Sequence, residues 1–365
     1  MLSSGPGTTG PLTLYHLFQD NIMIKFVVKG VLVSNNPIIG VTMGDPSGIG
    51  PEVVTKALSD IEVLSKCSPL VVGNFDVLKA TSQQLKIDLN IEPVSSIHDM
   101  KEGFISVLDM GNLDARNIDN GVVSAASGKA SVEWIIKAGE MALSGEISGM
   151  ATAPINKESA RMAGYDDIGH MEILQSLTSA KQVATMLTAG NLRVVHLTTH
   201  RSLAVAIEYV KKDNVLAKLQ LTNDCFYSWG YDKPRIAVAA LNPHGGEGGL
   251  LGREEVEEIL PAVELAQAKG MDVHGPIPAD SVFPQAIDGQ FDAVLVLYHD
   301  QGHIPIKVKD FHGSVSINLG FPFVRTSVDH GTAFDIAGMG IANALGMKQA
   351  ILTASYICTT GHLPN

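Results

Sequence analysis

The stretch PIIGVTMGDPSGIGPE, residues 37–52, joins a short apolar run to a polar, glycine-rich segment. The apolar run, residues 37–43, predicts a buried strand. The glycines and proline that follow predict a tight turn, and a helix is expected from about Pro51. A strand that turns directly into a helix is the repeating unit of α/β folds.

The same alternation continues along the chain. Further strands are expected at residues 69–73, 105–108, 150–153, 182–187, 193–197, 235–240, 273–275 and 293–297. Further helices are expected up to about residue 85 and at 123–143, 156–163, 214–229 and 254–269. Residues 182–187 and 193–197 should pair with each other. This order of elements predicts an α/β protein with a largely parallel sheet.

Composition narrows the class of protein. A chain of 365 residues is long enough for two lobes, since domains usually contain about 100–200 residues. The formal net charge of −12 argues against nucleic acid as a partner. The three cysteines form no CxxC pair, which is typical of a reducing, cytoplasmic setting. No run approaches the roughly 20 apolar residues of a membrane span. Residues 1–36 are expected to be a leader outside the fold, with Met23 as an alternative start.

Three histidines follow predicted strands in polar, glycine-containing contexts: His200, His244 and His299. Ligands of open α/β sheets bind at the carboxyl ends of strands. Neutral imidazole is the commonest metal ligand, and three such ligands with an open position suit a catalytic metal. A single histidine is more often a core or capping residue, so spacing alone leaves both interpretations open. We expect the nearby His196 and His303 to be packing or surface residues.

Other polar groups carry a similar ambiguity. The turn at residues 44–48 could place an anion at a helix N-terminus or serve only as a strand–helix connection. His170, at the start of a predicted helix, could contact an anionic substrate or cap the helix. Lys307 and Arg325 lie in apolar, strand-like stretches and could bind phosphate or form structural ion pairs. Residues 329–338, DHGTAFDIAG, should open a small-residue helix suited to a nucleotide.

Seven motifs occur in an order that resembles the 4-hydroxythreonine-4-phosphate dehydrogenase family and its paralogues. They are GVTMGDPSGIGPE (40–52), ATAPINKE (151–158), GHME (169–172), TTH (198–200), LNPHGGEGG (241–249), YHDQGHIPIK (298–307) and RTSVDHGTAFDIAG (325–338). Two of them also look like segments of isocitrate and isopropylmalate dehydrogenases. The resemblance implies that two-lobed fold, with mixed sheets and helices on both faces. One lobe would contain residues 37–150 and 325–365, and the other residues 151–324.

The resemblance also implies roles for individual residues. The metal ligands would be His200, His244 and His299, drawn from both subunits of a homodimer with the metal at the interface. The substrate would contact His170, Met171, Lys307, Ser316 and Arg325. The cofactor would contact His330, Gly331, Thr332, Ala333 and Asp335. The family pattern has Thr at position 171 and Asn at position 316, so Met171 and Ser316 remove a hydroxyl and an amide from the site, with Asn318 nearby in the sequence.

The chemistry implied is oxidation of a secondary alcohol by NAD or NADP with one divalent metal per site, such as zinc, cobalt or magnesium. A 3-keto acid product could then lose carbon dioxide. Lys157 and Asp300 are candidates for the proton acceptor. The expected substrate is a phosphorylated four-carbon hydroxy acid, either 4-hydroxythreonine 4-phosphate of pyridoxine biosynthesis or 4-phospho-threonate or -erythronate of four-carbon acid sugar metabolism. The alternatives are an aromatic cis-dihydrodiol acid as substrate, a metal-dependent hydrolase or aldolase, and a non-catalytic binding paralogue.

Overall fold

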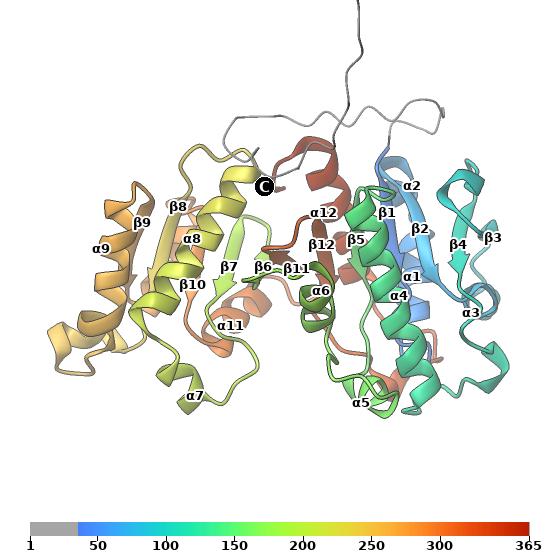
Figure 1. The fold of residues 1–365 in the computed structure, drawn as a ribbon, viewed down its shortest axis with the longest axis horizontal. Coiled ribbons are helices and arrows are strands. Elements are labelled where there is room, and N and C mark those ends of the chain that lie inside the picture. The colour runs from blue at the N-terminus through green and yellow to red at the C-terminus, as the bar shows by residue number, and fades with distance from the viewer. Residues whose placement is uncertain (1–35, 365) are drawn as a thin grey trace, which may run out of the picture. The chain divides into compact units, whose positions relative to one another are not determined.

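The computed structural model describes residues 36–364 of the chain. Except for Asn36, the leader predicted at residues 1–36 lies outside them. The strands are β1 (Ile38–Thr42), β2 (Ser68–Gly73), β3 (Ile91–Val94), β4 (Ile105–Asp109), β5 (Gly149–Thr152), β6 (Ala184–Ala189), β7 (Leu192–His196), β8 (Arg235–Ala239), β9 (Asp272–Ile277), β10 (Ala293–Val296), β11 (Val315–Leu319) and β12 (Val324–Val328). They form one twelve-stranded sheet in the order β3-β4-β2-β1-β5-β12-β11-β6-β7-β10-β8-β9 (Figure 1).

The sheet is parallel toward both edges and antiparallel in the middle. β1 pairs in parallel with β2 and β5, and β10 pairs in parallel with β7 and β8. Between these groups, β11 runs antiparallel to both β12 and β6, and β6 runs antiparallel to β7. The predicted pairing of the strands near residues 182–187 and 193–197 is therefore confirmed.

The α-helices are α1 (Gly50–Leu58), α2 (Ile61–Lys66), α3 (Phe75–Leu85), α4 (Ala125–Ser144), α5 (Lys157–Met162), α6 (His170–Thr178), α7 (Leu203–Glu208), α8 (Lys212–Ser228), α9 (Leu260–Ala268), α10 (Ala279–Ile287), α11 (His299–Lys309) and α12 (Leu345–Thr360). Short turns of 3₁₀ or π type lie at Ile97–Asp99, Ala115–Asn117, Pro243–Gly249, Glu255–Ile259 and Phe334–Ile336.

Helices cover both faces of the sheet. α4 and α12 each contact β1 and β5, and they lie on opposite sides of these strands (Figure 1). In the other half, α10 and α11 contact β7 and β10. A smaller apolar cluster, including Val194, Val294 and Ile306, fills the space beneath α10 and α11. The predicted α/β class with a mixed sheet and helices on both faces is confirmed. The division into lobes near residues 150 and 325 stays a prediction.

Two local predictions are wrong. Lys307 lies on helix α11 rather than on a strand. In a strand Ile304 and Ile306 would point to the same face, but Ile306 is buried and Ile304 is 59% exposed. Residues 329–338 form a loop with one 3₁₀ turn instead of a helix. Ala333 and Gly338 have φ angles of 42° and 75°, a left-handed conformation that a right-handed helix cannot contain.

Candidate functional site

A cavity of about 460 Å³ lies where several strands end. Its walls include residues that directly follow β5, β7, β10 and β12, as expected for an open α/β sheet. Ten of the residues that the sequence singled out line it: Lys157, His170, Met171, His200, His299, Lys307, Ser316, Arg325, His330 and Gly331. The fold therefore brings together side chains that are separated by up to 174 positions in the sequence.

The floor of the cavity consists of two rows of side chains across β6, β11 and β12. The first row contains Leu187, Ser316 and Ser327, which are direct partners in the strand register. The second contains Thr185, directly opposite Asn318, and Arg325, which donates from Nη1 to Asn318 Oδ1. We call this second set the polar row. All six residues line the cavity.

Arg325 is the most buried cation of the cavity wall, with 4% of its surface exposed. Its Nη2 donates to Thr152 Oγ1, but its Nε is buried and has no partner within residues 36–364. Burial lowers the pKa of its guanidinium to about 9. His170 Nε2 is likewise buried without a partner, and burial together with Arg325 holds the pKa of His170 well below its usual value. A buried cation next to unused polar atoms is an arrangement that an anionic ligand would complete.

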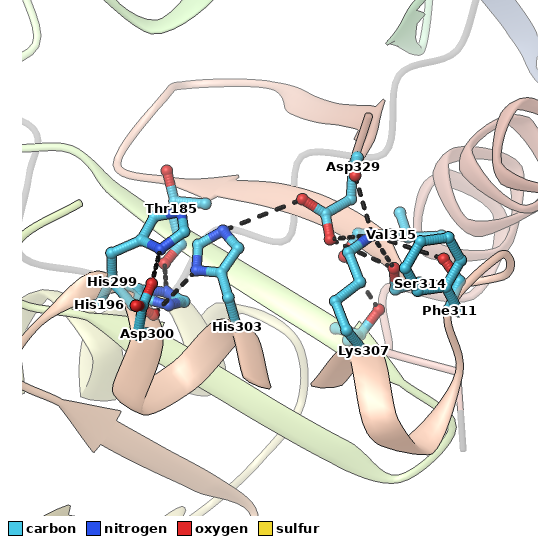
Figure 2. Close-up of polar contacts among 11 residues, drawn as sticks. Thr185, His196, His299, Asp300, His303, Lys307, Phe311, Ser314, Val315 and Asp329 are labelled. Atoms are coloured by element: carbon cyan, nitrogen blue, oxygen red, sulfur yellow. Dashed lines mark hydrogen bonds and ion pairs between the residues drawn. The ribbon is translucent and has the colours of Figure 1, made fainter. Parts of the chain in front are cut away.

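Four histidines lie in succession near the same cavity. The rings of His200 and His299 are 5.8 Å apart, and His303 stacks on His299 at 3.6 Å between ring centroids. His196 completes the group, with its ring 4.7 Å from that of His303 (Figure 2). Burial, Lys157 and His299 lower the pKa of His200, so its imidazole is neutral at neutral pH. His196, which was expected either to pack or to face solvent, is 2% exposed, whereas His303 lines the cavity.

Lys307 reaches the cavity but is already engaged. Its Nζ lies 2.8 Å from Asp329 Oδ2, 2.9 Å from the Asp329 carbonyl and 3.2 Å from Ser314 Oγ (Figure 2). These three acceptors match the three hydrogens of an ammonium group. In this arrangement Lys307 joins α11 to the end of β12.

A second cavity of about 290 Å³ adjoins the first, and Lys307, Asp329, His330 and Gly331 line both. Of the predicted cofactor residues, His330, Gly331 and Ala333 line it, whereas Thr332 and Asp335 are not among its lining residues. The Thr332 carbonyl instead accepts a hydrogen bond from the Ile49 backbone. The turn at residues 44–48 therefore packs against the 329–338 loop, which favours a connecting role for that turn.

His244 lies outside both cavities. It belongs to a turn, Pro243–Gly249, in which residues 244–248 all have positive φ angles, and we call this segment the His244 turn. Three of those five residues are glycines, which adopt this conformation without strain. His244 is exposed, and its Nδ1 lies 2.9 Å from Glu247 Oε1. Within residues 36–364, no group of three or more His, Cys, Asp or Glu side chains is placed to hold a metal ion.

The two residues predicted as proton acceptors differ in placement. Lys157 begins α5, lines the cavity and is near enough to lower the pKa values of both His170 and His200. The Asp300 carboxylate instead lies 2.7 Å from His299 Nδ1 and is largely exposed. His299 and His244 therefore share one feature: a neighbouring carboxylate binds Nδ1 and leaves Nε2 free.

Sequence reasoning did not single out Thr185, noted Asn318 only as a neighbour of Ser316, and included Asp329 only as part of the 329–338 segment. Asp329 stands in a motif already quoted, and Asn318 lies two positions from Ser316 on one strand, so same-face alternation could have indicated both. Thr185 could not be found this way, because its place depends on which strand pairs with β11.

The model of the family described as pyridoxal phosphate biosynthetic protein PdxA matches residues 65–354. The chain belongs to this family. A Clostridium botulinum member, named as a candidate D-threonate 4-phosphate dehydrogenase, is 44% identical over 326 residues, covering 89% of this chain and 98% of its own. A Symbiobacterium thermophilum member with the same name is 45% identical, covering 87% and 96%.

Solved structures of the family agree with the fold. The 4-hydroxythreonine-4-phosphate dehydrogenase of Klebsiella pneumoniae has a TM-score of 0.84 and 38% identity, covering 89% of this chain and 99% of its own. A terephthalate 1,2-cis-dihydrodiol dehydrogenase of Burkholderia xenovorans is more distant, with a TM-score of 0.60 and 27% identity, covering 90% and 99%. The recognised family is thus confirmed, and membership makes this chain an oxidoreductase of the dehydrogenase class. No helix within residues 36–364 is long and apolar enough to cross a membrane.

Proposed function

We propose that this chain is an NAD(P)- and metal-dependent dehydrogenase of a phosphorylated four-carbon hydroxy acid, with 4-phospho-threonate as the first candidate. One observation carries the proposal: a single cavity combines a buried, unsatisfied cation with the His200–His299 pair and shares a wall with a second cavity. The cation suits the phosphoryl group, the histidines suit a metal at the reacting carbon, and the second cavity suits the nicotinamide cofactor.

The histidines fit a divalent metal in part. His200 and His299 face the same cavity, and Asp300 fixes the ring of His299 in the way that carboxylates orient metal-binding imidazoles. His244, with Glu247 on its Nδ1, has the same pairing and would supply the third ligand from a second copy of the chain. A divalent cation bound there would lower the pKa of the substrate hydroxyl and favour hydride loss. Zinc, cobalt and magnesium are all compatible with this proposal.

The surroundings of His244 support the homodimer. Leu250 and Leu251, which follow the His244 turn, are 87% and 50% exposed, and Val256 beyond them is 42% exposed. Apolar side chains grouped at the surface mark an interface more often than free solvent contact. A second copy covering them would bring His244 next to the His200–His299 pair.

The residues of this chain divide the remaining work. Lys157, beside His200, would accept the hydroxyl proton, and Asp300 would orient His299. His330, Gly331 and Ala333 would hold the cofactor in the second cavity, where Asn343 adds a polar side chain. Thr332 and Asp335 would shape the loop. Loss of carbon dioxide from the keto acid would follow oxidation.

The charge of the cavity favours a threonate over a hydroxythreonine. Lys157 and Arg325 give the cavity positive walls, and of its two lining carboxylates, Glu172 and Asp329, the second is paired with Lys307. 4-Hydroxythreonine 4-phosphate carries an ammonium group at C2, which these cations would repel, whereas 4-phospho-threonate carries a neutral hydroxyl there. The names of the curated relatives agree with this choice. The three cysteines are free thiols, which is consistent with a cytoplasmic enzyme.

The decisive experiment is a substrate panel. The purified protein with NAD or NADP and a divalent metal should form NADH or NADPH with 4-phospho-threonate, and more slowly with 4-hydroxythreonine 4-phosphate. 4-Phospho-erythronate and an aromatic cis-dihydrodiol acid complete the panel. Turnover without nucleotide would favour a hydrolase or aldolase. Binding without turnover of any substrate would favour a non-catalytic paralogue, and either result would overturn the proposal.

A further inference from the structure

The polar row leaves hydrogen-bond donors unused. The Thr185 hydroxyl lies 3.8 Å from the sulfur of Met171, which is a weak acceptor. Asn318 uses its Oδ1 to accept from Arg325, while its Nδ2 is 3.5 Å from the Ala184 carbonyl, at the limit of a hydrogen bond. Together with Arg325 Nε, the row therefore offers three donors that the protein itself barely uses.

The row also lacks a negative charge. Arg325 is buried and no carboxylate of residues 36–364 forms an ion pair with it, since Glu172, which also lines the cavity, favours its charge only from a longer distance. A buried, unpaired guanidinium is unfavourable because it has lost its hydration without gaining a counterion. An anion is the one group that would satisfy the charge and the three donors at once.

A helix start adjoins the row. Helix α6 has nine residues, begins at His170, and has no side-chain cap at Gly169. The first backbone N–H groups of a helix have no partner inside it, and here Glu172, in the first turn, places a carboxylate beside Gly169. His170 Nε2, buried without a partner, lies in the same wall. Arg325, His170 Nε2 and the donors of the polar row together favour an anion with several oxygens, which is a phosphoryl group.

We propose that Thr185 and Asn318 are specificity-determining residues for the phosphoryl end of the substrate. Thr185 donates its hydroxyl hydrogen to a phosphoryl oxygen. Asn318 is a positioning residue: it accepts from Arg325 Nη1 and so fixes the guanidinium with Nε directed at the same group. The proposal rests on the proposed function only in taking the substrate to be phosphorylated.

The two departures from the family pattern then have a common explanation. Met171 lacks the hydroxyl found at that position in the family pattern, and the Thr185 hydroxyl lies next to the Met171 sulfur. Ser316 lacks the amide, and Asn318 is two residues further along the same strand, on the same face. Both functional groups remain in the cavity wall, but neighbouring residues supply them.

Thr185→Val tests the first part, because valine keeps the shape of threonine and removes the hydroxyl. Inorganic phosphate is titrated into the full-length protein by calorimetry, without substrate or cofactor. A lost hydrogen bond to a charged group should weaken phosphate binding by about tenfold or more. Thr185→Ser, the matched control, should stay within about twofold of the wild type. Equal phosphate affinity in the valine variant would overturn the role of Thr185. Thr185→Ala replaces the valine variant if the latter does not fold.

Asn318→Asp tests the second part. Aspartate can still accept from Arg325, so a stable protein that binds phosphate normally would show that the phosphate does not lie beside this pair. The proposed role predicts a stable protein that no longer binds phosphate, because the new carboxylate neutralises the guanidinium and repels the anion. Asn318→Leu should raise KM for the phosphorylated substrate about tenfold and change kcat little, since the contact is remote from the reacting carbon. Normal phosphate binding by Asn318→Asp contradicts the proposal.

These readouts separate the inference from the proposed function. If the wild type binds phosphate and the variants behave as described, the polar row stands even when no substrate of the panel is oxidised. If the wild type oxidises 4-phospho-threonate but Thr185→Val has an unchanged KM, the proposed function is supported and the proposed role of the polar row is contradicted.

Discussion

The His200–His299 pair and the His244 turn present the same side chain in opposite settings. His200 and His299 face a cavity formed by strand ends, whereas His244 projects from an exposed, left-handed turn. The first setting is held by the sheet, and the second by glycines and a few hydrogen bonds at the surface. Under the proposed function, the chain carries two half-sites, a concave one and a projecting one, and each would be completed by a second copy.

Mixing two variants is the most direct test of whether the two half-sites come from different copies of the chain. His200→Ala and His244→Ala should each be inactive, with a loss greater than the roughly 100-fold caused by removing a group behind a metal ligand. Mixed dimers of the two should regain one intact site in two. Random exchange would therefore restore about a quarter of wild-type activity in a coupled NADH assay.

The matched control is a mixture of His200→Ala with His299→Ala. Both lesions lie in the concave half-site, so each site of the mixed dimer keeps one of them and no activity should return. Recovery in this control, or none in the first mixture, would show that the three histidines do not come from two chains as proposed.

The second test concerns what holds the projecting half-site. Glu255 is buried, and its carboxylate accepts from the backbone of Leu241 and Asn242 and from the Asn242 side chain, at 2.6–2.8 Å. Glu255→Ala should lower the free energy of unfolding by about 3 kcal/mol, because buried donors lose their acceptor. Urea denaturation measures this loss, and Glu254→Ala, which removes one contact of a half-buried carboxylate, should change stability less.

Glu247→Gln should change the affinity for the metal without changing the stability of the fold. Glu247 and His244 are both exposed, so stability in urea should not change. Metal affinity, measured by competition with a coloured chelator, should fall by roughly 10–100-fold because the imidazole loses its orienting carboxylate. An unchanged metal affinity would show that Glu247 does not orient His244 for metal binding.

The smallest expected effect is on the stability of the protein at acidic pH, and it comes from His196 near the His200–His299 pair. Burial, with His303, lowers the pKa of His196 to about 3, while the unfolded chain protonates it near 6.5. Between these pH values the unfolded state binds more protons than the folded state. Protonation of this histidine therefore lowers the free energy of unfolding as pH falls from about 6.5 toward 3, by up to about 1.4 kcal/mol per pH unit. His196→Gln should flatten the decline in urea midpoint between pH 7 and pH 5. His244→Ala serves as the control, and equal slopes in both variants would contradict the prediction.

The sequence predicted the elements that have strong local signals. The β1–turn–α1 unit and the β6–β7 pair appear within a few residues of their expected bounds, because apolar runs and glycine turns act locally. Ten of the residues that it singled out line one cavity, since strand ends converge on one edge of a sheet, and their roles stay predictions. It did not find the polar row, because Thr185 meets Asn318 only through the register between β6 and β11. Nor did it anticipate that Lys307 would be occupied by Asp329, a contact between a helix and a distant loop.

The position of β12 has a consequence for how the protein is made. This strand joins β5 to β11, and its Val324 pairs with Gly149, so the two halves of the sheet are connected through a segment near the end of the chain. A ribosome delivers β5 long before β12, and domains tend to fold as they emerge. The growing chain therefore carries an unpaired edge of β5 until β12 has been synthesised. Truncations that remove β12 should consequently yield aggregation rather than a smaller soluble enzyme.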